Sequence, residues 1–304
     1  HTNDRRQRQM CIRDREYMGS TLNSLFTQRR NFFRPSFWGM LIDIIRFNRN
    51  GASLLDEGDT AISLEDYLKK EAYGKAFKED YLLPMASAVW SADKNMMSRF
   101  PAKYLIRFFY NHGLLKIFNR PQWYVIKGGS KEYVDAITRG HRHAIRLDTA
   151  VNSISRSDTG VIIKTSVDQE SFDYVFLACH SDQALSLLAN PRELEKEILG
   201  AITYQKNDAV LHTDTSLLPK NRRAWAAWNY HRLEREQDQV AMTYNMNILQ
   251  NFSCETQFCV TLNNTSAVDP SKIIAKMRYE HPVYTPESVA AQGRQREING
   301  QDRI

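Results

Sequence analysis

Three side chains that could form a hydrolytic triad stand side by side in this sequence, as His180, Ser181 and Asp182. A catalytic triad is an arrangement in space, however, and adjacency along the chain does not create one. The G-x-S-x-G turn that presents a nucleophilic serine is absent around Ser181. A serine directly before an apolar helical segment is typical of a helix N-cap, and we assign Ser181 that role.

Two pairs of residues could bind a metal ion. His141 and His143 could share one face of a strand, and Cys254 and Cys259 are separated by four residues. A structural zinc site needs four ligands, and no further pair stands at a matching spacing. We therefore predict no metal site and interpret the cysteines as buried or half-buried thiols.

A phosphate group could bind at Gly128-Gly129, because these glycines precede a predicted helix and a helix N-terminus can hold an anion. Neither G-x-G-x-x-G nor a Walker sequence occurs anywhere in the chain. Both a phosphate-binding turn and a plain tight turn remain open for this segment.

Large aromatic residues gather in one predicted strand. Because side chains alternate along a strand, Trp228 and Tyr230 share a face and Trp225 points the other way. Such a face beside a cofactor would shape an apolar substrate pocket. Ordinary packing in a sheet core is an equal alternative.

Arginines and aromatic residues are mixed ahead of a predicted amphipathic helix, where Arg29, Arg30 and Arg34 surround Phe32 and Phe33. This composition suits a membrane surface or the head group of an acyl lipid. The alternative is a surface helix with solvated arginines.

Composition excludes several classes of protein. With 304 residues, 42% hydrophobic and 25% charged, the chain reads as a globular protein with room for two domains. No apolar run reaches the roughly 18 to 20 residues that span a bilayer. Four cysteines do not suggest a disulfide scaffold, so we expect a reducing, cytoplasmic compartment.

The net charge of +6 does not indicate a nucleic-acid partner. Residues 1–15 hold five arginines and two aspartates, which is half of the excess. This stretch has neither a hydrophobic period nor a cap, and we interpret it as a non-native or disordered tail outside the fold.

Hydrophobic periodicity predicts a mainly helical first part and a mixed second part. We expect helices at 35–48, 63–70, 75–90 (kinked or divided at Pro84), 102–115, 130–138, 181–188 and 191–199, and a last one capped by Asp269-Pro270. We expect strands at 124–126, 144–147, 150–156, 161–167, 174–179, 210–213, 224–230, 240–246 and 258–262. The near-continuous apolar run at 174–179 is typical of a strand buried on both faces.

The order of these elements predicts an α/β fold with two interleaved domains. We divide the chain into the tail at 1–15, a helical substrate or cap region at 16–122, a partial Rossmann-like α/β region at 123–200, and a region at 201–304 with an antiparallel sheet and a C-terminal helix. The helical and antiparallel regions together would form an α+β substrate domain.

Taken in order, dispersed segments of the chain resemble the flavin-containing amine oxidase superfamily. The segments lie at 19–26, 81–91, 108–115, 120–123, 180–184, 210–214 and 224–230. They are most similar to a bacterial subgroup of predicted NAD/FAD-binding, amine-oxidase-like proteins. The resemblance implies FAD as cofactor and a partial FAD-binding region within 123–200.

Six residues acquire roles from this resemblance. Val151, Ala178 and Cys179 match positions near the cofactor in the family, and Trp123, Trp228 and Tyr230 are expected to line the substrate pocket. No catalytic acid or base is identified. In such proteins the flavin accepts a hydride, while the protein supplies orientation and an apolar cavity.

The resemblance implies an oxidoreductase that removes a hydride from a C–N or C–C bond of a small molecule or acyl lipid. It also suggests peripheral membrane contact at the inner face through Arg29, Arg30 and Arg34. A carotenoid-type desaturase or isomerase, and a non-catalytic lipid- or protein-binding module, are the alternatives. The family's N-terminal glycine turn and C-terminal glycine-rich segment have no counterparts here, so we expect an inactive internal fragment of a longer enzyme.

Overall fold

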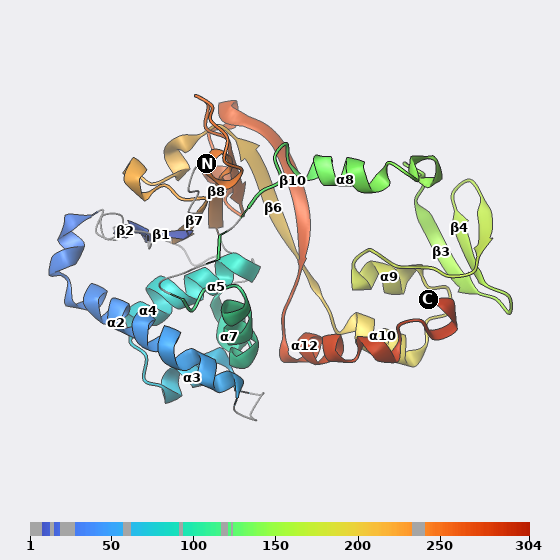
Figure 1. The fold of residues 1–304 in the computed structure, drawn as a ribbon, viewed down its shortest axis with the longest axis horizontal. Coiled ribbons are helices and arrows are strands. Elements are labelled where there is room, and N and C mark those ends of the chain that lie inside the picture. The colour runs from blue at the N-terminus through green and yellow to red at the C-terminus, as the bar shows by residue number, and fades with distance from the viewer. Residues whose placement is uncertain are drawn as a thin grey trace. The chain divides into compact units, whose positions relative to one another are not determined.

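The computed structural model describes residues 8–12, 15–18, 28–56, 62–90, 94–116, 121–122, 124–232 and 241–304. The chain divides into two compact units (Figure 1). Unit 1 comprises residues 1–125 and 206–281, and unit 2 comprises residues 126–205 and 282–304. Each unit is built from separate stretches of sequence, which is the interleaving predicted for the fold class.

The helices of unit 1 begin where the sequence places helix-starting residues. Pro35 occupies the first turn of α2, where its missing N–H removes no hydrogen bond, and the Ser63 hydroxyl accepts the Asp66 N–H (3.1 Å) to cap α3. These helices are η1 (Arg29–Phe33), α2 (Pro35–Asn50), η2 (Gly51–Leu55), α3 (Leu64–Lys70), α6 (Lys94–Arg99) and α7 (Ala102–Asn111).

Pro84 divides one predicted helix as the sequence indicates. The segment consists of α4 (Lys75–Phe77), the π-helical turn η3 (Lys78–Leu82) and α5 (Leu83–Trp90). Because proline has no N–H to donate, the regular ladder of hydrogen bonds is interrupted at this point, and a wider turn precedes it.

An aromatic core holds these helices together. The Phe47 side chain is 1% exposed, and its ring centroid lies 5.5 Å from that of Phe77 and 6.4 Å from that of Phe109. Tyr67 and Tyr73 complete the group at 6.5 and 5.8 Å from Phe47. Fully buried aromatic side chains of this kind dominate the energetics of a core.

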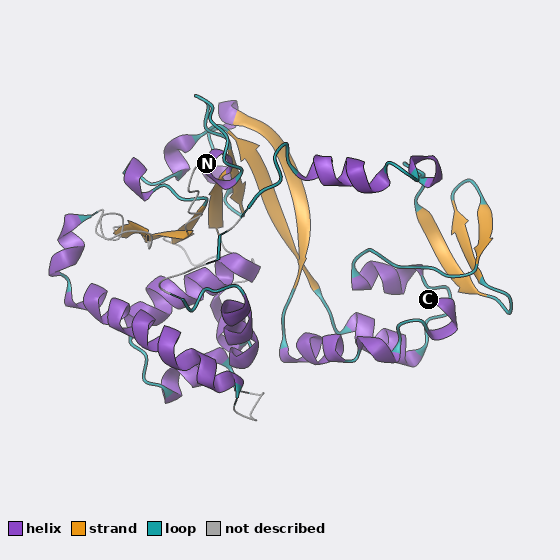
Figure 2. Cartoon of the chain, in the orientation of Figure 1, coloured by secondary structure: helices purple, strands orange, loops and turns teal. Residues whose placement is uncertain are grey.

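The sheet of unit 1 contains the four strands predicted after residue 206. They are β6 (Tyr204–His212), β7 (Trp228–Arg232), β8 (Ala241–Asn245) and β9 (Cys259–Leu262), and β10 (Ile273–Pro282) lies beside β6. The pairs β6–β9, β9–β8 and β8–β7 are antiparallel, as expected. Figure 2 shows these strands in orange.

Two expectations for unit 1 differ from the structure. The stretch at 1–15 was placed outside the fold, yet β1 (Arg8–Ile12) pairs in parallel with β7 and antiparallel with β2 (Arg15–Met18). The open backbone groups of an edge strand accept such an extension whatever its sequence period. The helix predicted after Asp269 is wrong: η8 (Pro270–Lys272) is a single turn, and the β-branched Ile273 and Ile274 enter β10.

Unit 2 contains a three-stranded antiparallel meander and four α-helices. The strands are β3 (Val151–Arg156), β4 (Val161–Thr165) and β5 (Gln169–Phe172). The helices are α8 (Ser130–Thr138), α9 (Ser181–Leu187), α10 (Glu193–Gly200) and α12 (Pro286–Gly293). The helices expected at 130–138, 181–188 and 191–199 are thereby confirmed, and α12 was not predicted.

Three predicted strands of unit 2 are wrong. Residues 124–126, 144–147 and 174–179 form no strand, because no strand of the described chain pairs with them to satisfy their backbone groups. In the third segment Val175 and Leu177 pack on a small core of Ile154, Val161 and Leu188. The intervening Phe176 is 93% exposed, so this segment is not buried on both faces.

Candidate functional site

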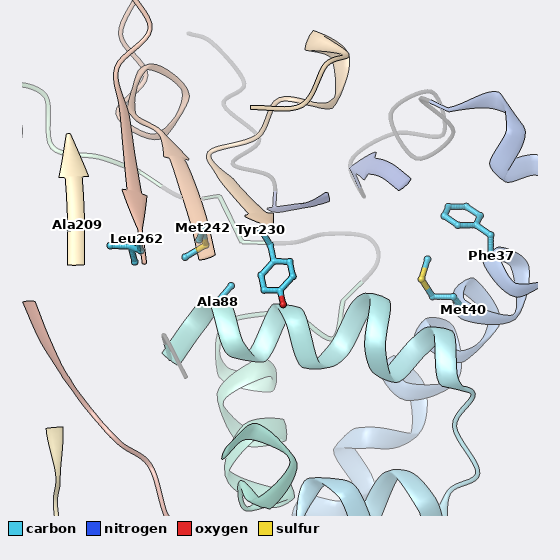
Figure 3. Close-up of a cluster of buried hydrophobic side chains, with 7 residues drawn as sticks. All are labelled: Phe37, Met40, Ala88, Ala209, Tyr230, Met242 and Leu262. Atoms are coloured by element: carbon cyan, nitrogen blue, oxygen red, sulfur yellow. The ribbon is translucent and has the colours of Figure 1, made fainter. Parts of the chain in front are cut away.

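One face of the unit 1 sheet is apolar and lies against helices (Figure 3). The strand register places Tyr230 opposite Met242, and Met242 opposite Leu262, on neighbouring strands. These three side chains pack with residues of α2 and α5 in one cluster, whose buried members are Phe37, Met40, Ala88, Ala209, Tyr230, Met242 and Leu262.

The predicted pocket residues Trp228 and Tyr230 lie on this face together. Tyr230 is buried, and Trp228 is half-buried with its ring 5.5 Å from Tyr244 in an edge-on contact. Trp225 precedes β7, and its indole N–H donates to the Pro219 carbonyl (2.8 Å). Trp123 lies outside the described residues.

The opposite face of the same sheet carries a chain of four polar side chains. His212 Nε2 lies 2.7 Å from Thr261 Oγ1, Thr261 Oγ1 lies 2.7 Å from Thr243 Oγ1, and Thr243 Oγ1 lies 2.9 Å from His231 Nε2. His212 and both threonines are fully buried, and His231 is half-buried. Four neighbouring strands thus contribute one hydrogen-bonded group each.

One backbone contact fixes the direction at the His212 end of this chain. The Asp214 N–H donates to His212 Nδ1 (3.1 Å), so a neutral His212 carries its proton on Nε2 and donates it to Thr261 Oγ1. Between Thr261 and Thr243 either hydroxyl can be the donor, and the contact of Thr243 with His231 fits either tautomer of His231.

Burial keeps both imidazoles of this chain uncharged. It lowers the pKa of His212, and it lowers the pKa of His231 to about 4. Burial alone would raise the pKa of Asp214, but the N–H groups of Asp269 and Ser216 hold it below its ordinary value. Burial also raises the pKa of the Cys259 thiol to about 12, so this cysteine is not a nucleophile.

The predicted cofactor residues lie in unit 2. Val151 is the first residue of β3 and pairs with Thr165. Ala178 and Cys179 lie in the irregular segment before α9, and both are exposed. The same segment also exposes the larger side chains of Tyr174 and Phe176.

The Gly128-Gly129 turn does not suit a phosphate group. Both glycines have φ of +87°, which explains the residue type. A Cβ atom at Gly128 would lie 2.8 Å from Glu132 Cγ and 2.9 Å from Glu132 Oε1. The acidic side chain therefore occupies the approach to this helix start and opposes an anion there.

The adjacent residues His180, Ser181 and Asp182 form no triad. The predicted N-cap is wrong by one residue: His180 is the N-cap of α9, and Ser181 is its first residue, with an N–H that donates to the Tyr204 hydroxyl (2.8 Å). The His180 ring stacks on the Tyr204 ring at 4.2 Å. Asp182 accepts the Gln183 N–H (2.8 Å), so each member has a local structural contact.

Histidine, cysteine and acidic side chains form no cluster of three that could hold a metal ion among the described residues, and this includes His141 and His143. The cysteines were predicted to be buried or half-buried: this is confirmed for Cys259 and wrong for Cys179 and Cys254, which are exposed. None of the described helices has the length and apolar character needed to cross a membrane.

A family model for flavin containing amine oxidoreductases matches residues 28–254. The chain belongs to this family of flavin-containing oxidoreductases. The matched range covers the helices of unit 1, the meander of unit 2 and the aromatic strand β7. The recognition made from dispersed segments is therefore confirmed, although no curated protein matches the chain.

Solved structures of this family share the fold at low sequence identity. A CLA-producing fatty acid isomerase from P. acnes superposes with a TM-score of 0.67 at 13% identity, covering 99% of this chain and 74% of the other. A putative protoporphyrinogen oxidase from Exiguobacterium sp. 255-15 gives 0.60 at 17%, covering 97% and 73%. Cyclohexylamine oxidase from Brevibacterium oxydans IH-35A gives 0.59 at 9%, covering 95% and 71%.

The described residues fit a flavin cofactor only in part. Unit 2 offers the edge of β3 at Val151 and the exposed segment at Ala178 and Cys179. A phosphate-binding glycine turn is absent from the sequence, and the one candidate turn, at Gly128, is covered by Glu132. The described residues therefore do not define a chemical step between this chain and a flavin.

Sequence reasoning missed the buried polar chain because it reads alternating polar residues as facing water. Asn229 and His231 in β7, and Thr243 and Asn245 in β8, alternate with apolar residues in that way. In the structure Asn229, Thr243 and Asn245 are fully buried instead, and Asn229 donates to the Ala226 carbonyl (2.7 Å). Asparagine and threonine recur at these alternating positions of neighbouring strands. That recurrence could have indicated a buried, hydrogen-bonded face.

Proposed function

We propose that this protein is an FAD-dependent oxidoreductase whose substrate is an apolar acyl chain. Family membership supplies the flavin chemistry, and the bound flavin would accept or return a hydride. Val151, Ala178 and Cys179 are proposed to contact the cofactor, and Trp228 and Tyr230 to line the substrate site. We propose a cytoplasmic position at the inner face of a membrane, where acyl lipids are available.

The observation that carries the substrate class is the apolar face of the unit 1 sheet. All the described side chains that β9, β8 and β7 place on this face are apolar or aromatic, among them Val260, Leu262, Tyr244 and Trp228. A cationic amine would lose its hydration there. A hydrocarbon chain would instead gain free energy by burial.

The role of these side chains is to bind and orient rather than to transfer protons. The Tyr230 ring is fixed by packing on Met242 and Ala88, and Trp228 is fixed by its contact with Tyr244. Rigid aromatic walls hold an alkyl chain in a limited range of positions and exclude water from the reacting carbon.

An isomerase is a second candidate, since a structure that shares this fold with a TM-score of 0.67 is described as a fatty acid isomerase. At 13% identity this likeness supports the fold alone, and the activity remains a proposal for this chain. An oxidase would leave a product with one more double bond, whereas an isomerase would return the hydride and leave the number of double bonds unchanged.

The test is an anaerobic titration of the flavin-loaded protein with an unsaturated fatty acid and, separately, with a primary amine. We expect the fatty acid to bleach the oxidised flavin or to be converted to a positional isomer, and the amine to do neither. Trp228→Ala should raise KM for the fatty acid by at least about tenfold. Reaction with the amine alone would contradict the acyl substrate, and a protein that takes up no flavin would favour a non-catalytic binding module.

A further inference from the structure

Helix α2 carries apolar residues on two different faces. Phe37, Met40 and Phe47 point into the core and are at most 1% exposed. A surface helix normally presents polar residues on its other side. On α2 that side instead carries Trp38, Ile42 and Ile45.

This second stripe is exposed to solvent. Trp38, Ile42 and Ile45 are 41%, 62% and 48% exposed, and their spacing of four and three residues places them on one helix face. In the preceding turn η1, Phe32 is 54% exposed and Phe33 is 83% exposed. We call these five side chains the outer α2 face.

The aromatic end of the outer α2 face is held in a defined arrangement. The Phe32 ring lies 5.8 Å from Phe33 and 5.5 Å from Trp38, both edge-on. The Trp38 indole N–H donates to the Phe32 carbonyl (2.9 Å), so this polar group is satisfied within the protein. The rings can therefore enter an apolar medium without exposing an unsatisfied donor.

Positive charge surrounds the outer α2 face. Arg29, Arg30 and Arg34 stand at its aromatic end, and Arg49 stands at the other end. The single acidic residue between positions 28 and 50 is Asp43, which is 8% exposed. Asp43 accepts the Gly74 N–H (2.8 Å) and pairs with Arg46 (3.0 Å), so this segment carries an excess of positive charge.

We propose that the outer α2 face docks on the surface of an anionic phospholipid bilayer. In this arrangement α2 lies parallel to the membrane, its aromatic and isoleucine side chains enter the boundary between head groups and acyl chains, and the arginines contact lipid phosphates. The 16-residue helix is too short to span a bilayer, which makes this an interfacial contact.

A second copy of the chain fits this surface less well. A twofold contact brings the same patch of each subunit together, so arginines would face arginines. Between positions 28 and 50 the sequence holds five arginines and one acidic residue. The charge pattern therefore favours a negatively charged partner. The inference depends on the surface alone and stands whether or not the proposed reaction is correct.

The test is co-sedimentation with phosphatidylcholine vesicles made with and without phosphatidylglycerol. We expect binding only to the anionic vesicles. The double variant Phe33→Ser, Ile42→Ser should bind at least about tenfold more weakly, since two exposed apolar side chains are lost. Phe176→Ser is the matched control, because Phe176 is 93% exposed and belongs to unit 2, and it should bind as the wild type does.

The electrostatic part is tested by Arg29→Gln, Arg30→Gln and Arg34→Gln combined. At about fivefold per arginine near an anionic surface, we expect a loss of roughly a hundredfold. Arg139→Gln, an exposed arginine of unit 2, should have no effect. Equal binding to both kinds of vesicle, unchanged binding by the double variant, or a dimer that the double variant dissociates would each overturn the proposal.

Discussion

The two units of this protein differ in how completely they bury their apolar side chains. Unit 1 buries the rings of Phe47, Phe77 and Phe109 almost completely. Unit 2 buries smaller hydrophobic residues, namely Ile154, Val161, Ala184, Leu188, Ile198 and Ala291, while Phe176 is 93% exposed. The helical core of unit 1 is therefore closed, although its outer α2 face is exposed, and unit 2 leaves much apolar surface in water.

Helix α8 shows the same contrast within a single element. Its hydrophobic residues Tyr133, Val134 and Ile137 share one face, as in an amphipathic helix, yet they are 45%, 47% and 66% exposed. In α7 of unit 1 the corresponding face carries Leu105 and Phe109, both at most 1% exposed. Amphipathicity predicted both helices, but only tertiary contacts decide whether the apolar face is covered.

The largest effect is expected for Phe47→Ala in unit 1. Removing a buried ring leaves a cavity and should lower the free energy of unfolding by about 3–5 kcal/mol. Urea unfolding followed by tryptophan fluorescence measures this, because all five tryptophans belong to unit 1. A loss below about 1 kcal/mol would show that the helical core of unit 1 is looser than described.

In unit 2 the largest effect should come from Glu195→Gln. Glu195 is 4% exposed and pairs with Arg156, so the substitution leaves a half-buried guanidinium without its counter-charge. We expect a loss of about 3 kcal/mol in local stability, seen as faster hydrogen exchange in β3 and α10. Lys196→Gln, which breaks an exposed pair with Glu193, is the control and should change exchange little.

The polar chain of unit 1 predicts a pH dependence. Because burial holds the pKa of His231 at about 4, below its unfolded value, the unfolded state binds more protons between these two values. Stability should therefore fall as the pH falls from about 6.5 to 4.5, by about 2 kcal/mol after allowance for partial exposure. In His231→Gln this part of the loss should disappear, and a pH dependence equal to that of the wild type would contradict the assignment.

The smallest effect is expected for Ile137→Ser on α8. Since Ile137 is 66% exposed, the change should alter stability by less than about 0.5 kcal/mol. Thermal unfolding followed by circular dichroism would detect a larger effect. A loss of about 2 kcal/mol or more would mean that this apolar face is covered in solution, which would remove the contrast between the units.

Sequence patterns were sufficient for elements whose periodicity agrees with their local contacts. The strands around Trp228 and Thr261, the Pro84 break and the Ser63 cap all follow from residue type and spacing. The turn predicted at Gly128-Gly129 is present, and both glycines have a positive φ that other residue types rarely adopt. These features depend on neighbours that are close in sequence, so one sequence is enough to find them.

Features that depend on distant residues were not predictable in the same way. The hydrophobic run at 174–179 has the composition of a buried strand, but no strand of the described chain pairs with it. Ile273 and Ile274 join β10 because β6 lies alongside, which outweighs the helix start at Asp269-Pro270. The His212–Thr261 contact joins residues 49 positions apart, and no local pattern encodes it.

The most direct test is hydrogen exchange of the whole protein with and without saturating FAD. The account predicts strong protection of Phe47, Phe77 and Phe109 in both states, because the core of unit 1 is complete by itself. It predicts fast exchange at 174–179 that slows when FAD is added, because Ala178 and Cys179 are proposed to contact the cofactor. Fast exchange in the aromatic core, or no response of unit 2 to FAD, would contradict it.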